Sequence, residues 1–482
     1  MTRGEHRRRI SSRRFPAIVV LAALLVAAGV ADRDHGGQVR ASAAPVLAGA
    51  MPTAAPPTSL NSSWYCPGAT SAPGGPANGS ITILNTGDRP LTAKVTVVPV
   101  TGDAKTLSVP VPAKARTLVH EIDILTAPVA AALVDLDGGA AAVELTVNGP
   151  GGWDSTPCAS AASDRWYFAT GTTDRDATLL VTLFNPFPGD AIVDLSFATD
   201  QGPSVPGEFQ GLIVPAGRLT VVNVGDHVRR RADVATTVVA RAGRVVAGKI
   251  QTQAPPAVAT VAALGAPSDG ASWVFPDGFA DAGVTEQYHL YNPNNRDATA
   301  TLSAVLDQGE ADPLPLTVPP QATVVVVTND QNRIPKGVGH SATVRSTNGV
   351  GIVVERTLAA GKPSPRLGLG DVLGARRAAP RWALPVGAAA AGIDEVIVLF
   401  NPGTRPATAA VTAFGQSQGP GIEGLQALSV PAGGRLAIQL DDHITGDPLP
   451  VLIDASEPVV VERALYFVGA GGVILTMGIP IG

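Results

Sequence analysis

The sequence has little cysteine, few aromatic residues and little charge. Of its 482 residues, 2 are Cys, 4% are aromatic and 16% are charged. The cysteines form no Cys-x-x-Cys or Cys/His spacing, which argues against a cysteine-based metal or redox centre. The His-Glu-x-x-His, Walker and Gly-x-Gly-x-x-Gly motifs, which mark zinc proteases and nucleotide-binding enzymes, do not occur either. We therefore predict no catalytic residue, no metal site, no cofactor and no enzymatic activity.

Helical periodicity is also missing, since no stretch of useful length repeats its apolar residues every three to four positions. The 53 Gly and 42 Pro make up about a fifth of the chain, which is typical of many short strands joined by turns. A chain of 482 residues is too long for one hydrophobic core. The composition therefore predicts an all-β protein of several domains.

The N-terminus is the one strongly basic region. An apolar run from Phe15 to Ala31 follows six arginines, which are Arg3, Arg7, Arg8, Arg9, Arg13 and Arg14. This order is typical of an export signal, and a run of 17 residues also reaches the lower limit for crossing a bilayer. Residues 1–31 are thus predicted to be a cleaved signal peptide or an uncleaved anchor helix. Both alternatives place the rest of the chain outside the cytoplasm, secreted or anchored to the cell membrane.

The remainder of the chain is acidic, because the net charge of −5 includes +5 from residues 1–31. We therefore expect no nucleic-acid partner, and contact with a membrane only through residues 15–31 if they are retained. Residues 32–60 are rich in Ala, Pro, Ser and Thr, a composition that predicts a disordered tether.

Four copies of one pattern follow the tether. Each copy opens on a Trp and reaches, after 21, 19, 19 and 19 residues, an Asn that ends an apolar strand. A Val-Pro turn comes next, and an Asp always follows its proline by 11 residues. These landmarks are Trp64, Trp166, Trp273 and Trp382; Asn85, Asn185, Asn292 and Asn401; and Asp123, Asp226, Asp330 and Asp442. The constancy predicts tandem duplication.

Each copy contains six or seven short segments, several of which alternate apolar and polar residues as a half-buried strand does. This pattern predicts four immunoglobulin-like antiparallel β-sandwiches arranged as a linear array. The expected ranges are 61–160, 163–267, 271–380 and 381–482.

The landmarks are interpreted as structural. One large aromatic side chain per copy favours core packing over an exposed ligand platform. Proline after Asn185 ends the strand, and the Asn side chain can bond to the turn backbone. The fixed Asp is expected to end a strand and accept turn N–H groups.

One strand of each copy carries charge amid apolar residues, at Glu144, Lys249, Glu355-Arg356 and Glu462-Arg463. A charge in such a strand must face water or be paired, since burying it unpaired is costly. We expect these charges to be solvated or to protect a sheet edge. The alternative is a repeated ligand contact, with Tyr65 and Tyr167 as further candidate contacts.

The two cysteines, Cys66 and Cys158, flank the first copy. An even number of cysteines outside the cytoplasm indicates a disulfide. The bridge is expected to join the two ends of that copy.

A Trp followed 19 residues later by the Asn of Phe-Asn-Pro, then Val-Pro-Ala-Gly, then Val-Glu-Arg-Ala-x-Tyr-Phe, is a pattern that resembles repeats of exported proteins from actinobacteria and other bacteria. These repeats are gathered in a domain-of-unknown-function family. The resemblance covers Trp64 to Gly482, and "WYCPG" (residues 64–68) with Cys158 is its most specific part. It implies export and immunoglobulin-like repeats, and no activity. The first copy departs from the pattern, with Asn85-Thr86 in place of Asn-Pro.

The function expected from these observations is a structural, adhesive or scaffold role at the cell envelope, with another envelope protein or a cell-wall glycan as partner. The first alternative is a module that binds cell-wall or surface glycan, for which Tyr65, Tyr167, Phe275 and Tyr288 are the aromatic candidates. The second alternative is an accessory subunit of an envelope enzyme.

Overall fold

The computed structural model describes residues 51–254, 258–387, 392–414, 422–444, 449–468 and 471–482. The predicted signal or anchor segment and residues 32–50 of the predicted tether lie outside the described residues. Within the described part of the chain, no helix is long and apolar enough to cross a membrane.

The first repeat contains two antiparallel sheets that a parallel bridge between Thr70 and Asn78 joins. The first sheet has the spatial order β4 (Lys105–Val111), β3 (Leu91–Pro99), β6 (Ala127–Leu136) and β1 (Ser62–Ser71). The second has the order β5 (Ala115–His120), β2 (Asn78–Asn85), β7 (Ala141–Gly149) and β8 (Gly152–Pro157).

The second and third repeats each contain two separate sheets with the same strand order. In the second repeat, one sheet has the order β12 (Gly202–Ser204), β11 (Ala191–Thr199), β15 (Val234–Ala242) and β9 (Arg165–Phe168), and β13 (Leu212–Val214) also pairs with β11. The other sheet has the order β14 (Arg218–Asn223), β10 (Ala177–Asn185), β16 (Val246–Gln253) and β17 (Ala259–Leu264). In the third repeat, the first sheet has the order β18 (Ser272–Phe275), β23 (His340–Ser346), β20 (Ala298–Leu306) and β21 (Leu314–Val318). The second sheet has the order β22 (Ala322–Val327), β19 (Val284–Asn292), β24 (Val353–Ala360) and β25 (Gly368–Leu373).

In the fourth repeat, the long strand β31 (Val451–Phe467) belongs to both sheets. Its partners in one sheet are β28 (Ala407–Ala413) and β26 (Ala379–Leu384), flanked by β29 (Leu428–Val430) and β33 (Ile479–Pro480); in the other they are β27 (Ile393–Phe400) and β32 (Val473–Met477), with β30 (Arg435–Gln439) on β27. β26 begins two residues before the predicted start of this repeat, at Arg381. The short 3₁₀ helices are η2 (Glu121–Asp123), η3 (Gly207–Phe209), η4 (Val224–Asp226), η5 (Thr328–Asp330) and η6 (Leu440–Asp442).

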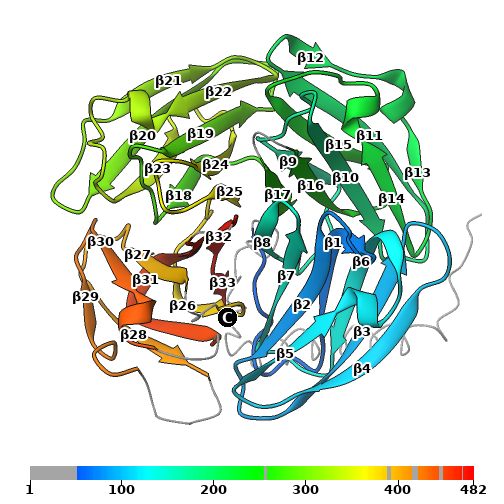
Figure 1. Ribbon diagram of the computed structural model, residues 1–482, viewed down its shortest axis with the longest axis horizontal. Helices are drawn as coiled ribbons and strands as arrows, with labels where there is room; N and C mark the ends of the chain where they lie inside the picture. Colours follow the sequence, from blue (N-terminus) through cyan, green and yellow to red (C-terminus); the bar gives the residue numbers. More distant parts are fainter. Residues whose placement is uncertain (1–50, 255–257, 388–391, 415–421, 445–448, 469–470) are drawn as a thin grey trace, which may run out of the picture. The chain divides into compact units, whose positions relative to one another are not determined.

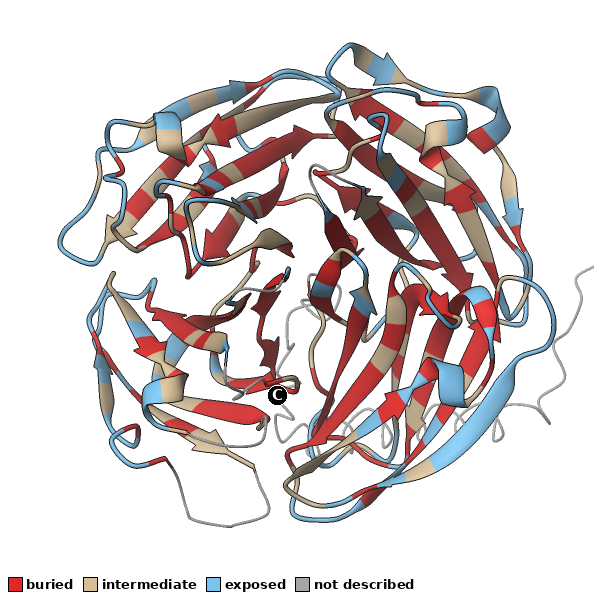
Figure 2. Cartoon of the chain, viewed as in Figure 1, coloured by how far each residue is buried: buried red, intermediate tan, exposed pale blue. Residues whose placement is uncertain are grey.

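The strands follow the alternation expected from the sequence. In β11, Ala191, Val193, Leu195 and Phe197 are buried, whereas the residues between them are exposed or half-buried. Figure 2 shows that exposed residues lie mainly on the outer strands of the repeats, while buried residues predominate in the strands nearer the centre. The prediction of an all-β chain built from repeated small antiparallel sheets is therefore confirmed.

The prediction of a linear array is wrong, because the described repeats close into a four-bladed, propeller-like ring. One strand of each repeat lies at the centre, where β8 contacts β17, β17 contacts β25, β25 contacts β32, and β32 contacts β8 (Figure 1). All six residues of β17 and all five of β32 are buried. These strands carry apolar residues on both faces, so each needs a neighbouring repeat to cover it.

Residues 51–56, predicted to belong to a disordered tether, instead pack against the first and last repeats. Met51 and Ala54 are buried, and Ala54 forms a bridge with Ile481. The Ala54 amide donates to the Pro480 carbonyl at 2.9 Å, and the Ala140 amide donates to Ala55 at 2.8 Å. The apolar residues of this segment therefore help to close the ring.

Candidate functional site

The charged strands lie where successive repeats meet. Each pairs with the strand that ends at the landmark Asn, so the register shows which positions are equivalent. We count back three residues from the landmark Asn and take the residue paired with that position on the charged strand as the acidic position. The residue that follows it on the charged strand is the basic position. The acidic position holds Glu144, Gly248, Glu355 and Glu462, and the basic position holds Leu145, Lys249, Arg356 and Arg463.

The basic position of one repeat pairs with the acidic position of the next. Lys249 lies 2.8 Å from Glu355, and Arg356 lies 2.5 Å from Glu462. Arg463 of the last repeat lies 3.3 Å from Glu144 of the first, so three of the four interfaces carry such a pair. All these side chains are at most 1% exposed. The ion pairs therefore run in one direction around the ring.

Each acid also accepts a hydrogen bond from a backbone amide of the preceding repeat. The donor is always the fourth residue after the landmark Trp. Thr170 donates to Glu355 at 3.1 Å, Asp277 donates to Glu462 at 3.0 Å, and Val386 donates to Glu144 at 2.8 Å. Hydrogen bonds and an opposite charge together offset the cost of burying a carboxylate.

The prediction that these charges are solvated is wrong. Burial raises the pKa of Glu144, and raises that of Glu462 to about 7 although Arg356 opposes the shift. Burial acts in the opposite direction on Arg356, but the carboxylates around it raise its pKa well above the ordinary value. A local sequence pattern does not show that a neighbouring repeat supplies the partner.

Two of these interfaces contain additional buried polar groups. Between the third and fourth repeats, Arg356 also bonds Glu286 at 3.0 Å, and His340 lies 2.9 Å from the same carboxylate. Burial works against ionisation of Glu286, yet His340 and Arg356 hold its pKa at about 2. Between the second and third repeats, Asp371 of β25 lies 2.6 Å from Lys249.

The interface between the first and second repeats has no ion pair at these positions, because Leu145 and Gly248 occupy them. A Cβ atom on Gly248 would lie 2.5 Å from the Pro67 Cβ. Pro67 follows Cys66, which forms a disulfide with Cys158 as predicted. The irregular part of β1 that the disulfide holds therefore lies against the position that an acid occupies at the other interfaces.

The landmark Trp and Asp residues make no ion pair at the interfaces described above. All four Trp side chains are at most 1% exposed, and the indole N–H groups of Trp166 and Trp273 each donate to a backbone carbonyl at 2.8 Å. The prediction that the landmark Asp residues end strands is wrong, because all four end the short helices η2, η4, η5 and η6, where they are exposed.

The four landmark Asn side chains are buried and make the same three hydrogen bonds. In Asn185, the amide donates to Gly189 at 2.8 Å and to Val214 at 3.0 Å, and the carbonyl accepts from Phe187 at 3.0 Å. The equivalent bonds occur at Asn85, Asn292 and Asn401. Each Asn thus ties the turn after its strand to the Val-Pro segment.

The candidate ligand contacts are mostly inside the protein. Tyr167, Phe275 and Tyr288 are buried, and Tyr65 is half-buried with its ring 6.5 Å from that of Phe184. These positions do not form an exposed aromatic platform. Glu355, Arg356, Glu462 and Arg463 come together with partners from neighbouring repeats, as described above.

Sequence reasoning missed the residues that complete these clusters, namely Thr170, Asp277, Glu286, His340 and Asp371. For Asp371 a signal existed, because it is the one charged residue in the strand "GLGDVL". The other four are separated from their partners by at least 50 residues. Their proximity depends on the ring, which the sequence did not indicate.

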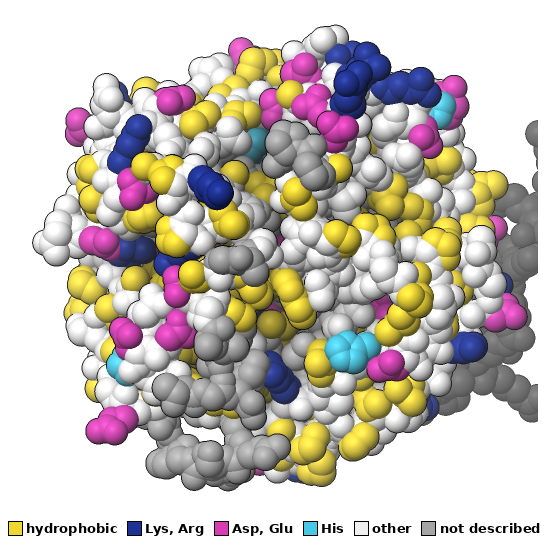
Figure 3. Space-filling view, in the orientation of Figure 1, with side chains coloured by type: hydrophobic (Ala, Val, Ile, Leu, Met, Phe, Trp, Pro, Cys, Tyr) yellow, Lys and Arg dark blue, Asp and Glu magenta, His cyan; other side chains and the backbone are white. Residues whose placement is uncertain are grey.

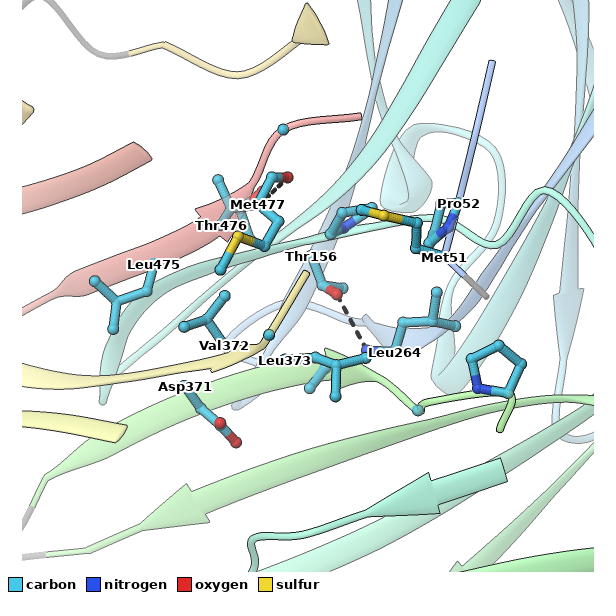
Figure 4. Close-up of a pocket in the computed structure, with 17 residues that line it drawn as sticks. Met51, Pro52, Thr156, Leu264, Asp371, Val372, Leu373, Leu475, Thr476 and Met477 are labelled. Carbon is cyan, nitrogen blue, oxygen red and sulfur yellow. Dashed lines mark hydrogen bonds between the residues drawn. The ribbon is translucent and has the colours of Figure 1, made fainter. Parts of the chain in front are cut away.

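Two cavities at the centre are small, whereas one outer groove is larger. The cavity in Figure 4, of about 50 Å³, lies among the inner strands beneath Met51 and Pro52. A groove of about 410 Å³ lies between the third and fourth repeats, and its charged lining residues are Glu310, Arg345, Arg376 and Arg377. Ligand pockets commonly measure about 300–1,000 Å³, a range that the groove reaches and the central cavity does not.

Charged side chains are dispersed over the surface. On the face seen in Figure 3, Lys and Arg lie in small, separate groups, often beside Asp and Glu. Within the described residues, no group of three or more His, Cys, Asp and Glu could hold a metal ion. The charged groups that the described residues do bring together are the buried ion pairs at the interfaces between repeats.

Comparison with known proteins gives a family but no activity. No curated protein matches the sequence. Thermotoga maritima 1070 is similar over 22% of this chain and 95% of its own, with 18% identity and a TM-score of 0.21. The Anabaena sensory rhodopsin transducer is similar over 18% of this chain and 94% of its own, with 26% identity and a TM-score of 0.17.

The model of the family of unknown function DUF5719 matches residues 126–270 and 258–460. The two segments overlap and together span more than half of the sequence. The chain therefore belongs to the family of unknown function DUF5719.

Proposed function

We propose that this protein is a non-enzymatic scaffold or adhesion protein of the cell envelope, secreted or held at the membrane by its N-terminal segment. The observation that carries the proposal is the set of buried ion pairs at three of the four interfaces between repeats. It commits the interior charges to holding four blades together, and such a ring presents its outer loops in fixed positions. Rigid presentation of loops suits a protein that makes contacts with others.

The location outside the cytoplasm is supported by two features. The basic and apolar N-terminus is typical of exported chains. The Cys66–Cys158 disulfide is of the kind that persists in oxidising compartments. We also propose that each repeat is an immunoglobulin-like sandwich, which its two antiparallel sheets support.

The test uses the full chain with a C-terminal tag in its native cells. We expect the tag to be digested by protease added to intact cells, or to be recovered from the medium. Cells that lack the protein should show altered surface attachment or envelope permeability, which the full chain restores. A tag protected inside intact cells, or unchanged surface properties on deletion, would contradict the proposal.

The outer groove supports the glycan-binding alternative, with an acidic surface polysaccharide as the ligand. Arg345 is exposed there, and Arg376 and Arg377 are half-buried beside it. We expect the full chain to be retained by purified envelope polysaccharide, and an Arg345→Ser variant to be retained several-fold less. Arg229→Ser, which changes an exposed arginine outside the groove, is the matched control. Equal retention of both variants would exclude the groove.

The accessory-subunit alternative stays a prediction.

A further inference from the structure

We propose that Lys249 and Asp371 condense to an amide that covalently joins the second repeat to the third, with Glu355 transferring the protons. The Lys249 Nζ lies 2.6 Å from Asp371 Oδ2 and 2.8 Å from Glu355 Oε2. An amine and a carboxyl held in contact react as an intramolecular pair, for which effective concentrations are very high. The inference goes beyond the scaffold role and does not depend on it.

The internal symmetry of the ring shows what is special at this interface. The basic position holds Arg at the other two charged interfaces, and a guanidinium keeps its proton in proteins. Here it holds Lys, whose amine becomes a nucleophile once it is neutral. The position of Asp371 on the inner strand is Ser155, Ala262 and Leu475 in the other repeats. Lysine and a second carboxyl therefore occur together, at one interface of the four.

The two carboxyls of this interface occupy different structural positions. At the Arg463 interface, Glu144 at the acidic position pairs with the base and accepts a hydrogen bond from a backbone amide. Glu355 has the same role between the second and third repeats, since it accepts a hydrogen bond from the Thr170 amide. Asp371 is thus the additional group, and we assign it as the electrophile.

The surroundings favour condensation over a solvated ion pair. The side chains of Lys249 and Glu355 are 1% exposed and that of Asp371 is 5% exposed. The Phe168 ring lies 5.8 Å from Nζ, and the Thr170 hydroxyl donates to Asp371 at 2.7 Å. Within the described residues, Glu355 Oε1 and Asp371 Oδ1 have no hydrogen-bond partner. Burial also raises the pKa of Glu355, which helps this carboxylate to take a proton.

The step balances without another reactant. Glu355 takes one proton from the Lys249 ammonium, and the neutral Nζ attacks the Asp371 Cγ. Glu355 then passes that proton to an Asp371 oxygen and moves a second proton from Nζ to the same oxygen. The C–O bond breaks, water leaves, and Glu355 ends as the carboxylate it began as. The cavity of about 50 Å³ that Asp371 lines is next to the site of release (Figure 4).

Peptide mapping of the full chain after tryptic digestion tests the amide. In an unlinked chain, trypsin cleaves after Lys249 and releases residues 367–376, which contain Asp371, as a free peptide. We expect instead that residues 367–376 appear joined to residues 245–296, with a mass lower by one water, about 18 Da. A free 367–376 peptide as the main species from the wild-type protein would overturn the proposal. A link from Lys249 to residues 346–356, which contain Glu355, would overturn it as well.

Two variants separate the chemistry from folding. Lys249→Arg copies the other charged interfaces, so it should fold and release residues 367–376 quantitatively. Glu355→Gln keeps a hydrogen-bonding side chain of the same size but cannot transfer protons as a carboxylate, so the linked fraction should fall at least tenfold. Circular dichroism and the Cys66–Cys158 disulfide report folding for both variants. A fully linked Glu355→Gln variant would overturn the role of Glu355.

Discussion

The interface between the first and second repeats differs from the other three in how it fills the same space. Three interfaces place a base against a buried acid, whereas this one has Leu145 and Gly248 at the two positions and places Pro67 against Gly248. Both members of the ion pair are absent together. Loss of one member alone would leave a buried charge without a partner, which is costly, whereas loss of both is not. The comparison indicates that each interface is maintained as a unit.

The largest effect is expected from breaking one charged interface. Arg356→Leu would leave Glu286 and Glu462 buried without their shared cation, and we expect the free energy of unfolding to fall by about 3–5 kcal/mol. Urea denaturation of the full chain measures it. Arg345→Leu, at an exposed position of the same repeat, serves as the control and should change stability by less than about 0.5 kcal/mol. Equal effects of the two variants would mean that the ion pairs do not hold the ring together.

Glu121 tests the same contrast between a paired and an unpaired buried acid. It is fully buried in the first repeat, neither of its oxygens has a hydrogen-bond partner among the described residues, and burial raises its pKa to about 8. Below pH 4.5, where the acid is protonated in both states, stability is complete. As pH rises towards 8, only the unfolded state ionises, so stability falls.

Glu121→Gln should therefore be more stable than the wild-type protein by about 3 kcal/mol at pH 7, because each pKa unit corresponds to about 1.4 kcal/mol. The advantage should shrink towards zero below pH 4.5. Thermal unfolding at pH 4 and at pH 8 measures it. Parallel pH profiles for the two proteins would show that Glu121 does not titrate between folded and unfolded states.

The disulfide is expected to stabilise the interface between the first and second repeats, which has no ion pair. Replacing Cys66 and Cys158 by Ser opens a loop of 92 residues and should lower the free energy of unfolding by about 2–4 kcal/mol. Because Pro67 loses its restraint, amide hydrogen exchange should increase most in β1 and β16, where the first two repeats meet. Faster exchange confined to the Lys249 or Arg463 interfaces would contradict this view.

The smallest effect is expected from a single methyl group. Gly248→Ala brings a Cβ to 2.5 Å from the Pro67 Cβ, and we expect a loss of about 1–3 kcal/mol from overpacking. Gly189→Ala is the control, because nothing lies within 4 Å of the added carbon. Pro67→Ala should recover part of the loss when combined with Gly248→Ala. Additive costs would show that the two residues do not share the space.

Much of the fold was readable from the sequence because it depends on local signals. Alternating segments such as residues 191–199 indicate strands, and the spacing from each Trp to its Asn and Asp reveals four copies. Ring closure depends instead on contacts between residues far apart, such as Arg463 and Glu144. The one local hint was the almost wholly apolar composition of residues 259–264 and 473–477, which lack the alternation of a strand exposed on one face.

The charged clusters were only half predictable. The adjacent pairs Glu355-Arg356 and Glu462-Arg463 were recognised, but their environment was not. Adjacent residues on a strand point to opposite faces, so the two members of such a pair serve different interfaces. The partners come from the repeats before and after, and nothing within one copy identifies them.

The one-way order of the ion pairs also limits how the gene for such a chain can change. Removing the second repeat by recombination would set Leu145 of the first against Glu355 of the third, leaving an acid that no base neutralises. Duplicating the third would insert a matching interface, yet a fifth blade must find room around the centre where β8, β17, β25 and β32 already meet. Unequal crossing-over, which readily lengthens or shortens open arrays, is therefore penalised here, and the number of copies is held at four.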